Sequence, residues 1–290
     1  MNPHVVERLL AWGVPQLRDL PWRNTRDRWA VLVSEVMAQQ TQVSRVIPKW
    51  QHFMREYPTP RACAEAPLSE LLRLWSGLGY PRRCKHLHDA ARLIVEHHNG
   101  EVPGDLAALQ ALPGIGGYTA RAVLAFADAA DVAVVDTNVA RVLARIGGSP
   151  LSARRSQEMA DHALPRGRAW EWNQVVMDFG AQVCTARQPR CGECAVSSLC
   201  ATRAAFGQQW RSDADPARAS ALTSKPQARF DGSDRQARGR LMRVLAERGV
   251  HRRDVSSAMQ LSDAVRAERL LDALVRDGLV VVEGEWCRLP

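Results

Sequence analysis

The amino-acid sequence has no apolar run that approaches the ~20 residues a membrane-spanning helix needs, and no signal peptide opens it. Internal repeats and long low-complexity tracts are absent as well. Alternating apolar and polar positions of the β type are few over residues 5–200, where apolar residues instead recur every three or four positions. These absences exclude a spanning protein and a repeat architecture, and they predict a mostly α-helical, cytoplasmic protein.

Acidic residues are in deficit, with 31 Asp and Glu against 39 Lys and Arg, so the net charge is +8 and the isoelectric point is near 9.5. A chain of 290 residues can bury the core of one large domain or of two ordinary ones. Excess positive charge favours a polyanionic partner. An anionic membrane surface would attract the same charge, but without a spanning segment we expect no membrane partner, and nucleic acid comes first.

Helical periodicity is clearest over residues 28–40, where five apolar residues fall at i, i+3, i+4, i+7 and i+8: Trp29, Leu32, Val33, Val36 and Met37. We expect further helices at about 68–75, 84–97, 105–111, 118–128, 137–146 and 170–183. Residues 205–229 lose the periodicity and gather Ser, Pro, Asp and Arg, which is typical of a linker. Helix-like segments and a terminal β-hairpin then predict a small winged-helix-like module over residues 230–290.

Four of the seven cysteines crowd together in the spacing C-x6-C-x2-C-x5-C: Cys184, Cys191, Cys194 and Cys200. This density suits a metal site in a reducing compartment better than a disulfide framework. Zinc would also accept four thiolates, but its usual sites pair two C-x2-C knuckles and only one occurs here. Staggered cysteines of this kind serve a [4Fe-4S] cluster, which we expect to stiffen a basic loop against phosphates. The other three are expected to be ordinary buried thiols: Cys63, Cys84 and Cys287.

A glycine-rich turn, LPGIGGYTA over residues 112–120, lies between two predicted helices. Gly114 and Gly116 permit a tight turn whose backbone N–H groups can point at a phosphate, helped by the positive end of the next helix. Asp136 stands at the mouth of another predicted helix, where Asp is a favoured N-cap. Glu35 lies away from the apolar stripe of the 28–40 helix and faces solvent or a cleft. Solvent is the expectation for an isolated glutamate.

Taken together and in order, the motifs resemble those of MutY-type adenine DNA glycosylases of the helix-hairpin-helix, iron-sulfur superfamily. The match covers residues 5–204 and rests on these segments: LPWR (20–23), SEVMAQQTQV (34–43), GLGY (77–80), the LPGIGGYTA hairpin, DTNV (136–139) and the four cysteines. The resemblance implies a two-lobed α-helical catalytic domain over residues 1–204, with the active site in the cleft between its lobes. These would be a six-helix barrel (28–133) and a cluster lobe (1–27 with 134–204).

The resemblance also implies roles for single residues. Glu35 matches the family's catalytic acid and Asp136 its catalytic aspartate. Tyr118 and Asn138 match residues that shape the catalytic site. The positions that match DNA-binding residues are Gln40 and Tyr80 in the base stack near the lesion, Trp22, Arg23 and Gln174 around the adenine pocket, and the hairpin glycines Gly114 and Gly116.

The implied reaction begins with the adenine nucleotide flipped out of the duplex, at a cost of about a few kcal/mol. A protonated Glu35 would donate to N7 of the base, a general-acid gain of order 10²- to 10⁴-fold. An ionised Asp136 would stabilise the oxocarbenium-like sugar electrostatically or trap it covalently, and the sequence leaves both open. Tyr118 stands where endonuclease III-type enzymes carry a Schiff-base lysine, so we expect a monofunctional enzyme that leaves an intact abasic strand.

The C-terminal region departs from the family pattern. Many members carry a larger Nudix-like domain that reads 8-oxoguanine opposite the adenine, whereas residues 230–290 do not resemble that domain and suggest a shorter, actinobacterial-like variant. Its helices either pack only together or clamp DNA. The resemblance alone therefore implies the substrate, which is double-stranded DNA with adenine opposite 8-oxoguanine or guanine. It also implies that a monomer binds this DNA at the nucleoid.

Two other functions are open at this point. An endonuclease III-like glycosylase and lyase acting on oxidised pyrimidines would cut the strand without alkali, and Tyr118 argues against it. A non-catalytic iron-sulfur DNA-binding regulator would release no base and would bind random and lesion-bearing duplexes equally. That function leaves the joint presence of Glu35, Tyr118 and Asp136 unexplained.

Overall fold

The computed structural model describes residues 1–207, 209–223 and 229–290, and its contacts divide the chain into two units. The first unit comprises residues 1–28 and 116–226, and the second comprises residues 29–115 and 227–290. Both are built mainly of α-helices, so the predicted fold class is confirmed. No helix among the described residues is long and apolar enough to cross a membrane.

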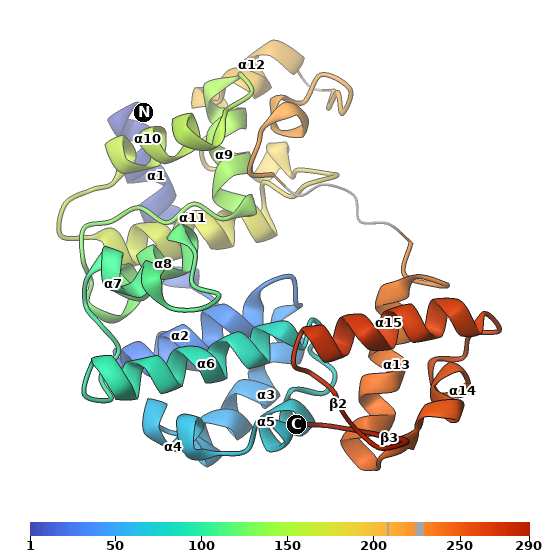
Figure 1. Cartoon of the computed structure of the whole chain (residues 1–290). Coiled ribbons are helices and arrows are strands. Elements are labelled where there is room, and N and C mark those ends of the chain that lie inside the picture. The colour runs from blue at the N-terminus through green and yellow to red at the C-terminus, as the bar shows by residue number, and fades with distance from the viewer. Residues whose placement is uncertain (208, 224–228) are drawn as a thin grey trace. The chain divides into compact units, whose positions relative to one another are not determined.

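The first unit is a helical bundle around α11, which packs against both α9 and α1 (Figure 1). Its α-helices are α1 (Pro3–Gly13), α8 (Gly117–Ala127), α9 (Thr137–Gly147), α10 (Ala153–Ala163), α11 (Ala169–Gln182) and α12 (Ala201–Phe206). Its 3₁₀ turns are η1 (Val14–Gln16), η2 (Pro21–Arg23), η3 (Cys191–Glu193), η4 (Ser197–Leu199) and η5 (Pro216–Ala219). Leu9, Leu143 and Phe179 are almost fully buried in its core, because each falls on the inward stripe of its helix.

The second unit begins with the helix that the apolar stripe predicts. Its first part contains α2 (Arg28–Ala38, of which Arg28 is counted with the first unit), α3 (Val43–Glu56), α4 (Pro60–Glu65), α5 (Leu68–Trp75), α6 (Arg82–His97) and α7 (Leu106–Ala111). All five stripe residues of α2 are buried. Helix α6 packs against α4 and α5, and Cys63 and Cys84 are buried as expected.

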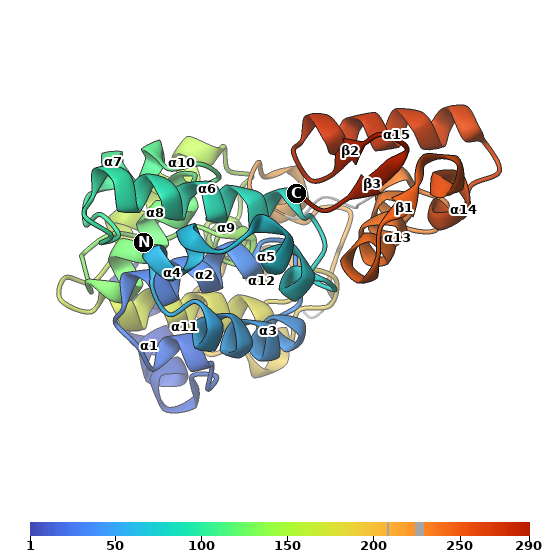
Figure 2. The same cartoon turned by 60° about the horizontal axis from the view of Figure 1, so that its bottom comes forward.

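The C-terminal part of the second unit combines three helices with a small antiparallel sheet (Figure 2). Its elements are α13 (Asp234–Glu247), β1 (Val250–His251), η6 (Arg252–Asp254), α14 (Val255–Met259), α15 (Ala264–Arg276), β2 (Val281–Glu283) and β3 (Trp286–Arg288). The strand order is β1-β3-β2, with Val250 and Val282 both opposite Cys287, and Gly284 forms the β2–β3 turn at φ +60°. Cys287 is buried, so all three isolated cysteines are the buried thiols that the sequence predicts.

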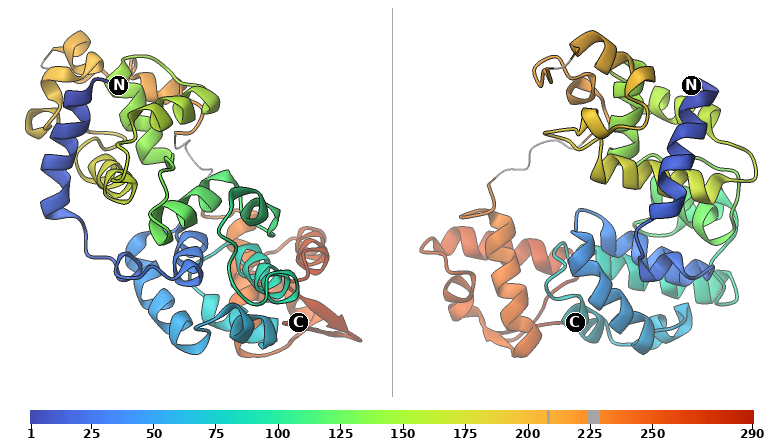
Figure 3. Two further views of the ribbon diagram at one scale, coloured as in Figure 1. Left: turned by 90° about the vertical axis from the view of Figure 1, so that its left-hand side faces the viewer. Right: turned by 180° about the vertical axis from the view of Figure 1, so that it is seen from behind.

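This C-terminal part packs on the first part of the same unit, with α13 against α5 (Figure 3). The backbone nitrogen of Ser69 donates to the carbonyl of Pro290 at 3.1 Å, and Nε of Arg73 donates to the carbonyl of Ala246 at 3.2 Å. The C-terminal part therefore contacts α5 of the same unit in addition to forming a core of its own.

Two boundaries differ from those expected. Helix α8 groups with the first unit at residue 116, and residues 227–290 group with residues 29–115. The expected linker over 205–229 is also wrong for part of its described length, because residues 209–223 pack on the first unit. Asp215 and Ala217 there are buried, and Asp215 pairs with Arg145 on α9 at 2.7 Å. An ion pair and a 3₁₀ turn, rather than an amphipathic helix, fix this segment, so it shows no helical periodicity.

Candidate functional site

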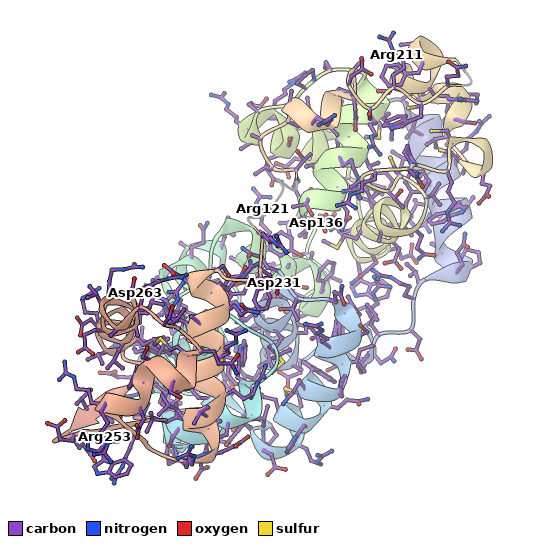
Figure 4. All side chains as sticks on the ribbon, turned by 90° about the vertical axis from the view of Figure 1, so that its right-hand side faces the viewer. Arg121, Asp136, Arg211, Asp231, Arg253 and Asp263 are labelled. Atoms are coloured by element: carbon purple, nitrogen blue, oxygen red, sulfur yellow. The ribbon has the colours of Figure 1, made fainter. Side chains whose placement is uncertain are left out.

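Asp136 is the N-cap of α9, as predicted, and is labelled in Figure 4. Its Oδ1 accepts hydrogen bonds from the backbone nitrogens of Asn138 (2.9 Å) and Val139 (2.7 Å), and its Oδ2 accepts one from Nδ2 of Asn138 at 2.7 Å. Burial raises the pKa of Asp136, and these bonds, which favour the carboxylate, offset only part of that effect. The carboxylate of Asp136 is thus fixed in position, and its hydrogen bonds replace only part of the hydration that it loses on burial.

Asn138 is fixed in turn by Arg141, one turn further along α9. Nη2 of Arg141 donates to Oδ1 of Asn138 at 2.8 Å and to the carbonyl of Gly180 at 2.7 Å, and Nε donates to the carbonyl of Cys184 at 2.7 Å. Arg141 therefore connects the Asp136 cap to α11 and to the first cysteine of the loop. The sequence prediction missed this residue, although two arginines four positions apart on the apolar face of α9, Arg141 and Arg145, are a visible signal.

A second missed residue, Asn173 on α11, positions the extended segment that leads into Asp136. Its Oδ1 accepts from the backbone nitrogen of Val134 at 2.9 Å, and its Nδ2 donates to the carbonyl of Val132 at 3.0 Å. The side-chain amide pairs with this backbone as a neighbouring strand would. Because Asn173 is buried, these two bonds also satisfy polar groups that cannot reach water.

The residues predicted around the adenine pocket lie in the first unit. Arg23, on η2, makes a bidentate ion pair with Asp178 of α11 at 2.9 Å, and Arg18 donates to the same carboxylate. Burial alone would raise the pKa of Asp178, but the bonds from Arg23 and Arg18 outweigh it and lower the pKa. Gln174 lies one turn before Asp178 and is buried, and Trp22 precedes Arg23 on η2 and is half-buried. Arg23 and Gln174 are therefore both anchored at one stretch of α11.

The predicted hairpin spans α7, the turn at 112–116 and α8. Gly114 needs to be glycine for two reasons: its φ is +75°, and an added Cβ would lie 2.8 Å from Cβ of His86 on α6. Gly116 is the N-cap of α8, and an added Cβ there would meet no atom within 4 Å. Steric contacts therefore do not require glycine at residue 116, and the space beside its Cα is open to a ligand. Tyr118 follows in the first turn of α8 and is half-buried.

Glu35 is buried on α2 in the second unit, with 9% of its surface exposed. The expectation that an isolated glutamate faces solvent is therefore wrong. Its neighbour Ser34 is also buried and donates its hydroxyl to the carbonyl of Val31 at 2.7 Å. Burial removes the carboxyl group of Glu35 from most of its hydration.

Gln40 and Tyr80, the residues predicted to enter the DNA stack, both adopt left-handed backbone conformations, with φ of +54° and +49°. For residues other than glycine, such a conformation costs of order 1 kcal/mol or more. It persists because the surrounding contacts impose it. Both residues lie in short loops of the second unit, after α2 and before α6.

Arg83 is the contact that joins these two loops, and the sequence prediction missed it. Its Nη1 donates to the carbonyls of Val36, Met37 and Gln39 at 2.9, 3.0 and 2.5 Å. Its Nη2 donates to Oγ1 of Thr41 and to the carbonyls of Leu78 and Gly79 at 3.0, 3.1 and 3.0 Å. Its guanidinium carbon lies 5.5 Å from the ring centroids of both Tyr80 and Trp75. Burial lowers the pKa of Arg83 to about 10, so the group stays charged at neutral pH.

The four clustered cysteines line one cavity of the first unit, together with Val183 and Arg145. Among the residues that the structure describes, no three His, Cys, Asp or Glu side chains are arranged to hold a single metal ion. Four thiols around one cavity are the donor set that iron-sulfur clusters use. Nη1 of Arg145 donates to Sγ of Cys184 at 3.4 Å, and burial raises the pKa of Cys194 to about 11. The donor set therefore fits a thiolate-bound cluster whose binding would release the protons.

Comparison with known proteins agrees with this geometry. Residues 33–164 match the HhH-GPD superfamily base excision DNA repair protein family, and residues 184–200 match the iron-sulfur binding domain of endonuclease III. Over 96% of its length the chain is 45% identical to the adenine DNA glycosylase of Mycobacterium tuberculosis, of which it covers 91%. The chain belongs to the adenine DNA glycosylase family.

Other members and solved structures extend the match. The chain is 43% identical to the adenine DNA glycosylase of Mycolicibacterium smegmatis over 94% of this chain and 91% of that one. The human adenine DNA glycosylase is 42% identical over 69% of this chain and 40% of its own length. A thermostable thymine-DNA glycosylase structure aligns with a TM-score of 0.67 and 30% identity, over 69% of this chain and 95% of its own. A non-covalent endonuclease III–DNA complex, 23% identical over 71% of this chain and 96% of its own, shares the fold with a TM-score of 0.64.

The helix-hairpin-helix fold and the [4Fe-4S] cluster predicted from the sequence are confirmed by the family matches. The two mycobacterial matches cover 96% and 94% of this chain, so they include most of its C-terminal part.

Proposed function

We propose that the chain is a monofunctional adenine DNA glycosylase of base excision repair. It hydrolyses the N-glycosidic bond of adenine paired with 8-oxoguanine or guanine in double-stranded DNA and leaves an abasic site. The observation that carries the proposal is the Asp136 carboxylate, which three hydrogen bonds fix at the N-terminus of α9, in a chain of this family. A fixed carboxylate stabilises a sugar cation in the transition state without reorganising.

The two carboxyl groups take opposite tasks in this reaction. Glu35, which is buried, donates a proton to N7 of adenine as the bond to the sugar breaks. Asp136, ionised and capped by Asn138, stabilises the positive charge that develops on the sugar before water attacks. The three hydrogen bonds at Asp136 favour its ionised form and offset part of the effect of burial, which raises its pKa.

The other predicted residues bind DNA in this proposal. Gln40 and Tyr80 fill the gap that the flipped adenine leaves, and their strained loops present them for this purpose. Trp22, Arg23 and Gln174 surround the flipped base. Gly114 and Gly116 let the backbone of the hairpin approach a phosphate.

We assign residues 1–204 to the catalytic domain and residues 230–290 to a winged-helix-like accessory module. The thiolates of Cys184, Cys191, Cys194 and Cys200 hold the [4Fe-4S] cluster, which when bound crosslinks the loop that follows α11. The loop also carries arginines such as Arg187 and Arg190, so a stiffened loop provides positive charge for phosphates. Tyr118 provides no amine at the hairpin, so no Schiff base forms there and the strand stays intact.

The test is base release from duplexes that carry A opposite 8-oxoguanine, A opposite G, A opposite T, or T opposite G, each with and without alkali. We expect adenine release from the first two, and strand cleavage only after alkali. Glu35→Gln and Asp136→Asn should each lower the single-turnover rate by at least about 10²-fold. Cleavage without alkali would support a lyase instead, thymine release would place the chain with thymine glycosylases, and native rates in both variants would refute the two assignments.

A further inference from the structure

The start of α13 touches the loop that carries Tyr80. Nη1 of Arg235, in the first turn of α13, donates a hydrogen bond to the hydroxyl oxygen of Tyr80 at 3.0 Å. The same guanidinium lies over the ring of Phe230, with its carbon 5.1 Å from the ring centroid. The phenyl ring of Phe230 is large and apolar, yet 51% of this residue is exposed. One arginine therefore connects two aromatic side chains that are about 150 positions apart in sequence.

The turn before α13 holds Phe230 in a defined place. The hydroxyl of Ser233 donates to the carbonyl of Phe230 at 2.6 Å and accepts from the backbone nitrogen of Gln236 at 3.2 Å. Oε1 of Gln236 accepts from the backbone nitrogen of Gly232 at 2.9 Å. This arrangement is a variant of the capping box, and it fixes the turn without using the phenyl ring. The phenyl ring of Phe230 is therefore left exposed at the surface.

Tyr80 is held from both of its ends. Arg83 binds the carbonyls of Leu78 and Gly79, just before Tyr80, and lies near its ring, and Arg235 binds its hydroxyl. A side chain that enters a base stack must keep its orientation while it separates two stacked bases, which costs stacking energy. Aromatic side chains with an arginine beside them form the usual stacking surface for unstacked bases.

The opposite end of the C-terminal module carries charges of both signs. The tip of the β2–β3 hairpin exposes Glu283 and Glu285, and α15 exposes Asp272. The arginines of α15 that face α13, Arg266 and Arg269, both pair with Asp234. At this end Arg288 pairs with Glu283 at 3.0 Å, so its charge is already balanced by a carboxylate. The exposed ring of Phe230 and the arginine over it, at the start of α13, are therefore the better candidates for contact with a base.

We propose that Arg235 is a positioning residue for Tyr80, and that Phe230 stacks on an unpaired base of the mismatch-containing duplex beside Tyr80. The C-terminal module thereby takes part in reading the lesion through its first turn. The inference rests on the proposed function, because it assumes that Tyr80 enters the DNA stack. It adds two residues of the module to the surface that recognises the mismatch.

The experiment is a double-mutant cycle on the full-length, cluster-loaded protein. Binding is measured on an A:8-oxoguanine duplex with an uncleavable adenine analogue and 2-aminopurine beside the 8-oxoguanine, and on the matched undamaged duplex. Arg235→Gln and Tyr80→Phe should each weaken binding to the mismatch duplex about tenfold, and the double variant no further, because both remove one hydrogen bond. Phe230→Leu should reduce the 2-aminopurine fluorescence change at saturating protein.

Arg253→Gln is the matched control, since Arg253 is an exposed arginine of the same module and lies at the other end from Asp231 in Figure 4. It should bind like the native protein, and all variants should unfold at similar temperatures. Additive losses in the cycle, equal losses on the undamaged duplex, or an unchanged fluorescence signal in Phe230→Leu would overturn the proposal. If the native protein perturbs 2-aminopurine but releases no adenine from any duplex, the proposed function fails, while the cycle still decides the role of Arg235.

Discussion

Gly180 on α11 approaches Asn138 on α9 so closely that a Cβ atom added at Gly180 would lie 2.7 Å from Cβ of Asn138 and 3.1 Å from its carbonyl oxygen. Such contacts are shorter than packed atoms allow, so one helix must move. Because Asn138 donates to the Asp136 carboxylate, the movement would reach the residue proposed to stabilise the sugar cation.

Gly180→Ala should therefore destabilise the protein by about 1–3 kcal/mol through overpacking, and should lower the excision rate by more than the loss of folded protein explains. Unfolding by urea and single-turnover base release measure the two effects. Gly239→Ala is the matched control, because Gly239 lies in α13 with no atom within 4 Å of an added Cβ. It should be neutral or slightly more stable. A native excision rate in Gly180→Ala would show that the Asp136 cap does not depend on this approach.

Much of the helical fold could be predicted because local patterns determine it. The apolar stripe of residues 28–40 predicts α2, which ends two residues earlier, at Ala38. The sequence predicts Asp136 as an N-cap because this residue follows an apolar run and precedes a helical pattern, and aspartate is a favoured N-cap residue. These features depend on residues close in sequence.

The missed residues all act over long sequence distances. Arg83 bonds to carbonyls more than 40 positions away, and Asn173 bonds to a segment about 40 positions earlier. Nothing near either residue in the sequence shows these partners. The burial of Glu35 belongs to the same class, because a helix position outside the main apolar stripe is buried only when another part of the fold covers it.

Arg83→Gln should lower the stability of the second unit and weaken binding to mismatched DNA. The glutamine cannot replace the six hydrogen bonds that the two terminal nitrogens make, so several carbonyls of the loops would lose their partner. We expect a loss of about 2–4 kcal/mol in the free energy of unfolding. Circular dichroism during urea unfolding and fluorescence anisotropy with a mismatch duplex measure the two effects.

Arg82→Gln serves as the control for Arg83→Gln. Arg82 is the preceding residue in the sequence, it is exposed, and its ion pair with Asp277 is long at 3.6 Å. A long pair whose arginine is exposed contributes little to stability, so this variant should change the free energy of unfolding by less than about 1 kcal/mol. Similar losses in both variants would mean that a general loss of positive charge, rather than the loop contacts, explains the effect.

Asp215→Ala should release the segment 209–223 from the cysteine loop. Asp215 and Arg145 are both buried, and removing the carboxylate leaves the arginine charge without its partner, at a cost of about 3–5 kcal/mol. Because Arg145 also donates to Sγ of Cys184 and the carbonyl of Thr185, the cluster should be lost faster to a chelator. Visible absorbance of the cluster over time measures this. Asp213→Ala, an exposed carboxylate in the same segment, should retain the native rate of loss, and equal rates in the two variants would contradict the prediction.

Asp136→Asn separates catalysis from stability through its pH dependence. Folding raises the pKa of Asp136 above its ordinary value of 3.8, so the ionised group destabilises the folded state at pH values above 3.8. That penalty is fully present above the raised pKa and disappears as the pH falls below both values. An asparagine does not titrate, although it places an amide donor against Nδ2 of Asn138 at every pH. The difference in Tm between native and variant should therefore shift in favour of the native protein between pH 7 and about pH 4.

The catalytic consequence has the opposite sign. Excision by the native enzyme needs ionised Asp136, so its rate should fall on acidification at a pH above that of an ordinary aspartate, whereas the variant should be slow throughout. Asp105→Asn is the matched control, because Asp105 is an exposed N-cap of α7 that accepts from the backbone nitrogen of Ala108 at 2.9 Å. Its pH dependence shows what any change from carboxyl to amide at a helix N-cap contributes. A Tm difference that moves toward the Asp136→Asn variant on acidification, after this correction, would mean that the cap hydrogen bonds outweigh burial at Asp136.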